Sequence, residues 1–80
     1  MAVNMPRLHY RRLEYTQMDK VSGVIFRELE KLGIEKTDID SLAWYKFGQY
    51  AKQPLIVFLR DGGIFKVGTR KGNLYVERIK

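Results

Sequence analysis

Apolar residues recur every three or four positions through residues 16–32, and this period predicts an amphipathic helix there. The positions that would form its buried stripe are Met18, Val21, Ile25, Leu29 and Leu32. Thr16, with Asp19 three residues later, approximates a capping box at the start, and Gly33 stands where a left-handed residue often ends a helix. Gly23 in a helix interior costs about 1 kcal/mol relative to alanine, so we expect close packing against another element there.

Beyond residue 41 the apolar positions change to the pattern of strands, with short turns between them. The expected strands cover residues 42–47, 54–60, 64–70 and 74–79, and residues 8–15 are a candidate for a further one. Glycines within 61–63 and 71–73 predict tight turns. Turns this short join antiparallel neighbours. The predicted fold is therefore α+β, with one helix packed on a three- to five-stranded antiparallel meander over about residues 42–80.

Local residue types add three details to this fold. Pro54 can open a strand, and the unbroken apolar run that follows it is typical of a central strand covered on both faces. Gly68 inside a predicted strand indicates a β-bulge. We expect residues 34–41 to form a connector with one helical turn capped by Thr37.

Length and composition place these elements in one domain. The 80 residues contain no linker-like segment, so we expect a flexible tail over residues 1–6 and a single domain over residues 7–80. The longest apolar run has five residues, far short of the ~20 that span a bilayer, and no signal-peptide pattern opens the chain. Absence of cysteine excludes disulfides and thiol chemistry. We expect a cytoplasmic protein without a membrane partner.

The net charge of +6 is unevenly distributed along the chain. Residues 1–15 carry a net +2 and residues 16–41 a net −2, whereas residues 42–80 carry a net +6. The excess positive charge therefore belongs to the predicted sheet and the N-terminal segment, and the predicted helix is mildly acidic. Basic side chains bind phosphates, and aromatic rings among them offer stacking surfaces for unpaired bases, so this segment predicts a polyanion-binding sheet.

Candidate nucleic-acid-binding residues lie on the predicted sheet, at its hairpin tips and in the N-terminal segment. They are Arg11, Arg12, Tyr45, Lys46, Arg60, Lys66, Arg70, Lys71, Tyr75 and Arg78. Strand alternation puts Lys66 and Arg70 on one face, and in the last strand it separates Arg78 from Tyr75. Lysine on edge strands also protects against aggregation without binding any ligand.

Aromatic residues in strands serve packing as well as binding. We expect Trp44, Phe47, Phe58 and Phe65 to belong to the core. The tyrosines, whose hydroxyl groups favour contact with water, are expected to be partly exposed: Tyr45, Tyr50 and Tyr75.

Catalytic chemistry is not indicated. His9 is the single histidine, so a histidine metal pair or a serine–histidine–acid triad lacks members. The carboxylates Glu35, Asp38 and Asp40 are explained by a helix start rather than a metal site. The glycines near 62–72 lack the spacing of a phosphate-binding loop. We expect no enzyme activity, no metal and no cofactor.

Two functions of different kinds are consistent with this sequence. The first is a small accessory or regulatory domain that binds nucleic acid, in single-stranded form or by shape, because no basic reading helix is evident. The alternative is a non-enzymatic protein-interaction module, such as an inhibitor, adaptor or small subunit, with a viral or mobile-element type as one option and homodimerisation as another.

Overall fold

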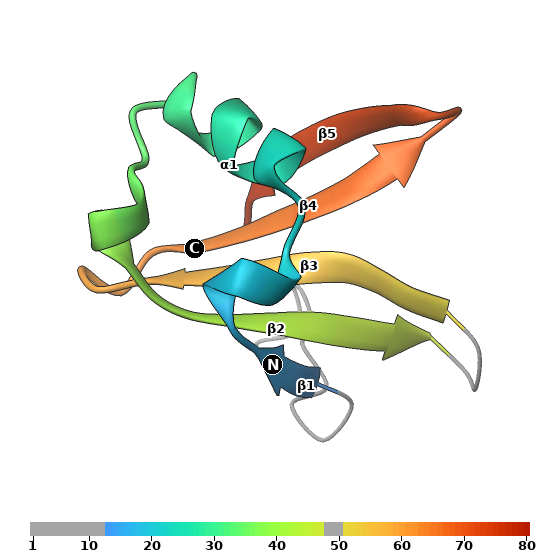
Figure 1. Ribbon diagram of the computed structural model, residues 1–80, viewed down its shortest axis with the longest axis horizontal. Coiled ribbons are helices and arrows are strands. Elements are labelled where there is room, and N and C mark those ends of the chain that lie inside the picture. Colours follow the sequence, from blue (N-terminus) through green and yellow to red (C-terminus); the bar gives the residue numbers. More distant parts are fainter. Residues whose placement is uncertain (1–12, 48–50) are drawn as a thin grey trace, which may run out of the picture.

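The computed structural model describes residues 13–47 and 51–80, and Figure 1 shows their arrangement. In chain order the elements are β1 (Leu13–Thr16), the 3₁₀ turn η2 (Met18–Lys20), α1 (Gly23–Glu30), the 3₁₀ turn η3 (Lys36–Asp38), β2 (Ile39–Phe47), β3 (Ala51–Leu59), β4 (Ile64–Arg70) and β5 (Asn73–Arg78). Predictions for the tail over residues 1–6, for His9, Arg11 and Arg12, and for Tyr50 lie outside the described residues.

The strands form one antiparallel sheet in the order β1-β2-β3-β4-β5, so each strand pairs with its neighbour in the sequence. This confirms the predicted α+β class, with one α-helix and five strands in the described part of the chain. Of the candidate strand at 8–15, residues 13–15 fall in β1 and residues 8–12 lie outside the described residues. The strand β1 pairs with β2 through Leu13 and Tyr45 at one end and Thr16 and Leu42 at the other.

The helix begins seven residues later than the sequence pattern predicts. Thr16 does not cap it, because this residue is the last of β1 and pairs with Leu42. Ser22 is the N-cap instead, and its hydroxyl oxygen accepts a hydrogen bond from the Val24 N–H at 3.3 Å. The segment between β1 and α1 forms the short turn η2. Pairing of Thr16 in the sheet therefore outweighed the local helical pattern.

Three of the five predicted stripe positions are buried as expected, namely Val21, Ile25 and Leu29. Met18 packs against the core from η2, but Leu32 is 55% exposed, so the prediction for Leu32 was wrong. The helix ends at Glu30, with Lys31 as its C-cap, two residues earlier than predicted. Gly33 has the left-handed conformation that the sequence predicts, with a φ of 84°. The Ile34 N–H then donates to the Leu29 carbonyl at 3.0 Å, which returns Ile34 to the core.

Gly23 is the first residue of α1 rather than an interior one. A Cβ at this position would meet no atom within 4 Å, so close packing does not explain the glycine.

We expect Gly23→Ala to raise the free energy of unfolding by about 0.4–1 kcal/mol, because alanine restricts the unfolded chain without a clash in the folded one. Chemical denaturation of the two proteins measures the difference. A loss of stability would show that the backbone at the helix start needs glycine.

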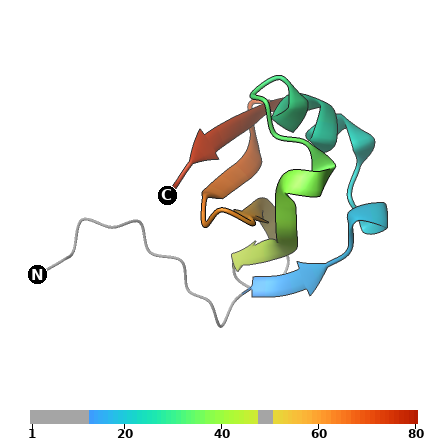
Figure 2. The same cartoon turned by 90° about the vertical axis from the view of Figure 1, so that its left-hand side faces the viewer.

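One face of the sheet packs against α1, and we call it the inner face; the other is the outer face. The inner face holds Leu42, Leu55, Val57 and Val67, which form the core together with α1 residues. Figure 2 shows the curvature of the sheet, with α1 and η2 on one side of it.

The irregular pairings lie between β2 and β3, not at Gly68. Register shifts occur between Ile39 and Ser41 and between Trp44 and Lys46. Gly68 pairs with Tyr75 in an unbroken register, so the predicted bulge was wrong. The structure gives this glycine another role, which concerns the candidate site.

Candidate nucleic-acid interface

Cross-strand pairing places several of the predicted basic and aromatic residues on the outer face. Lys66 pairs with Glu77, Gly68 with Tyr75 and Arg70 with Asn73. The intervening pair, Val67 with Val76, belongs to the inner face, because Val67 is in the core. Lys66, Arg70 and Tyr75 therefore share the outer face, as strand alternation predicts for Lys66 and Arg70.

Tyr75 and Arg70 form a stacked pair on this face. A Cβ on Gly68 would lie 2.9 Å from the Tyr75 hydroxyl oxygen and 3.0 Å from two of its ring carbons, so the ring lies directly over the glycine. The guanidinium carbon of Arg70 lies 4.5 Å from the centre of the same ring. Gly68 thus makes room for a flat aromatic surface, which the cation of Arg70 adjoins.

The hairpin turn beside this pair carries an exposed lysine. Lys71 and Gly72 have φ values of 54° and 82°, the left-handed pair that a two-residue type I′ turn requires. Arg70 and Asn73 pair on either side of the turn. The turn therefore holds the Arg70 and Lys71 side chains next to each other at the tip of the hairpin.

Lysine at a left-handed position is strained, whereas asparagine adopts this conformation readily. We therefore expect Lys71→Asn to raise the free energy of unfolding by about 0.5–1 kcal/mol, measured by urea denaturation. Lys71→Gln is the control, since it removes the same charge but keeps the strain. Equal stabilities of the two variants would contradict this explanation.

Three of the predicted bases lie close to carboxylates. Lys66 Nζ is 3.2 Å from Glu77 Oε1, Lys46 Nζ is 3.8 Å from Glu14 Oε2, and Arg60 Nη1 is 3.9 Å from Asp40 Oδ1. Arg60 also donates from Nε to the Thr37 carbonyl at 3.0 Å. Within residues 13–47 and 51–80, by contrast, no carboxylate lies within 4 Å of the basic groups of Arg70 or Lys71. Among the predicted binding residues that the structure describes, Arg70 and Lys71 at the β4–β5 tip therefore belong to those without a carboxylate within 4 Å.

Two further predicted residues do not add to this exposed surface, because one is buried and the other lies on the inner face. Tyr45 is only 8% exposed, so the expectation of an exposed ring was wrong. Arg78 pairs with Phe65, which packs against the core from the inner face. The guanidinium carbon of Arg78 lies 5.7 Å from the centre of the Phe65 ring. Its Nε donates to the Lys80 carbonyl at 3.2 Å.

Among the residues expected in the core, Trp44 and Phe65 are half-buried and pack against it. Phe58 is half-buried but lies on the outer face with Ser41, its partner in β2. The side chain of Phe47 lies outside what the structure describes.

An aromatic pair on the outer face was not predicted. Tyr15 is 64% exposed, and its ring stacks on Phe58 with centroids 6.3 Å apart. Tyr15 pairs with Ala43 of β2, whose small side chain allows rings from β1 and β3 to approach each other. Residues 8–15 were a candidate strand, but a strand pattern alone does not show that Tyr15 meets Phe58, because this contact depends on the register of β1, β2 and β3.

The acidic residues near η3 serve local structure. Asp38 accepts the Glu35 N–H at 2.8 Å, and Glu35 rather than Thr37 is the N-cap of the turn. Over the described ranges, no three histidine, cysteine, aspartate or glutamate residues lie together as a metal site requires. No helix in these ranges is long and apolar enough to cross a membrane.

Comparisons of this chain with protein-family models, with curated proteins and with solved structures find no match.

Proposed function

We propose that this protein binds single-stranded nucleic acid at its β4–β5 hairpin. In this proposal Arg70 and Lys71 contact phosphates, and an unpaired base stacks beside Tyr75. The observation that carries the proposal is the Arg70–Tyr75 stack over Gly68, because a ring seated on bare backbone and an adjacent guanidinium form one flat, cationic surface. Surfaces of this kind suit nucleic acid without requiring a defined sequence.

The distribution of charge favours single strands over duplex. A helix that enters the major groove must approach two phosphate backbones, and α1 carries Glu28 and Glu30 against Arg27. A sheet surface with aromatic rings instead suits single strands, whose unpaired bases can stack on the rings. Tyr15 and Phe58, on the same face near the opposite edge, provide a second stacking position for a longer strand.

Fluorescence anisotropy with labelled oligonucleotides tests this function. The wild-type protein is titrated into single-stranded RNA, single-stranded DNA and a duplex of the same sequence at several salt concentrations. We expect tighter binding to the single strands and an affinity that falls linearly with salt on logarithmic axes. Absence of binding at low salt, or a preference for the duplex, would overturn the proposal.

The alternative of a protein-interaction module is separated from this function by a pull-down with and without nuclease. Protein partners retained after nuclease treatment favour the alternative, and partners lost with the nucleic acid favour the proposal. Light scattering at two protein concentrations tests homodimerisation in the same preparation.

A further inference from the structure

We infer that a second site, separate from the β4–β5 hairpin, binds a single purine nucleotide. The site is a cleft beside β1 with a volume of about 600 Å³, lined by Glu14, Tyr15, Thr16, Gln17, Lys20 and Trp44. This volume lies in the range of small-molecule sites, roughly 300–1,000 Å³. Because β1 and β5 are opposite edges of the sheet, this inference can be tested independently of the proposed function.

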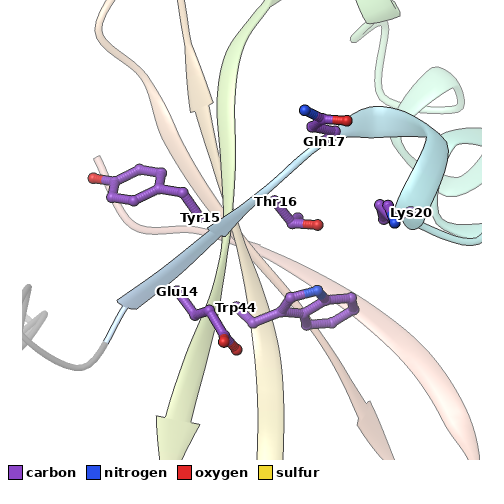
Figure 3. Close-up of a pocket in the computed structure, with 6 residues that line it drawn as sticks. All are labelled: Glu14, Tyr15, Thr16, Gln17, Lys20 and Trp44. Carbon is purple, nitrogen blue, oxygen red and sulfur yellow. The ribbon is translucent and has the colours of Figure 1, made fainter.

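Trp44 supplies the aromatic wall of the cleft. Figure 3 shows its indole on the same side of β1 as Thr16 and Lys20, while the Tyr15 ring points to the other side. Trp44 is half-buried: part of it packs against the core and part borders the cleft. A large ring held by the core and open on one side is a stacking platform for a planar base.

The polar groups around the indole differ from one end of the cleft to the other. Lys20, which is exposed, lies at the end formed by η2, and Glu14 lies at the end formed by β1. Lys46 Nζ lies 3.8 Å from Glu14 Oε2 and balances the charge of this carboxylate. Because Lys46 pairs with Glu14, the charge of Lys20 favours an anionic ligand at its end of the cleft.

These features together specify a nucleotide better than a simple anion or a neutral ring. The base stacks on Trp44, the phosphate reaches Lys20, and the Gln17 amide is available for hydrogen bonds between them. A purine presents a larger ring to the indole than a pyrimidine does, so AMP and GMP should bind more tightly than UMP.

The fluorescence of Trp44 reports binding directly, because it is the only tryptophan of the chain. The full-length protein is titrated at low salt with AMP, GMP, UMP and inorganic phosphate. We expect saturable quenching by AMP and GMP, weaker quenching by UMP and none by phosphate. Lys20→Gln should lower the affinity for AMP about threefold and leave that for adenosine unchanged, as one exposed charge contact predicts.

Lys31→Gln is the matched control, since it removes the same charge at the end of α1, where Lys31 pairs with Glu28. It should bind AMP like the wild type. An absence of quenching by AMP and GMP, quenching by phosphate alone, or an equal loss in Lys20→Gln and Lys31→Gln would overturn the inference. If AMP quenches Trp44 but oligonucleotides do not bind, the function proposed for the hairpin is overturned and nucleotide binding at the cleft is supported.

Discussion

Leu29→Ala is expected to lower the free energy of unfolding by about 2–5 kcal/mol, because it leaves a cavity between α1 and the sheet. Leu29 is fully buried in the core, and its carbonyl also accepts the hydrogen bond that ends the helix. A domain of this length has a total stability of about 4–12 kcal/mol, so the variant loses a large part of it.

The matched control for this substitution is Leu32→Ala, at a leucine that is 55% exposed. We expect a change within about 0.5 kcal/mol there, as for most surface positions. Urea denaturation followed by circular dichroism compares both variants with the wild type. Similar losses at the two leucines would mean that Leu32 also contributes to the core, as the helical spacing of the sequence predicts.

Removing both charges at the β4–β5 tip should have the largest effect on nucleic-acid binding. We expect Arg70→Gln combined with Lys71→Gln to weaken binding to a single-stranded oligonucleotide about tenfold at low salt. Each lost phosphate contact should also reduce the slope of log affinity against log salt by about 0.7, so the slope should fall by about 1.4. Anisotropy titrations at four or more salt concentrations measure both quantities.

A charge-matched double variant, Lys31→Gln with Lys36→Gln, distinguishes a local contact from the effect of net charge. These lysines lie after α1, where Lys31 pairs with Glu28 and Lys36 lies 4.9 Å from the centre of the Phe26 ring. The control should keep the wild-type salt slope. Equal reductions of slope in the two double variants would place the phosphate contacts elsewhere.

The sequence predicted those parts of the fold that depend on local chemistry. The fold class, the turn at Lys71-Gly72 and the left-handed conformation of Gly33 after the helix all follow from residue types at fixed spacings. The start of the helix did not follow, because Thr16 is held in β1 by pairing with a strand that lies far along the chain. A single-sequence pattern contains no information about such a distant partner.

The candidate site was predicted only in part, again because the sequence does not show which strands pair. Alternation along a strand correctly placed Lys66 and Arg70 on one face. It did not reveal that Tyr75 lies over Gly68, since this contact depends on the register between β4 and β5. Nor did it reveal that Lys66 lies beside Glu77, which reduces the charge that Lys66 presents.

The sequential order of the strands has a consequence for how the chain folds. Because β2 through β5 each pair with the next strand across a short connection, hairpins can form one after another with little loss of chain entropy. Only the pairing of β1 with β2 must close a longer loop, which contains α1. Chains with mostly local contacts fold quickly. The hairpin that carries Arg70 and Tyr75 therefore belongs to the part that can assemble early, and the edge beside Trp44 to the part that is completed last.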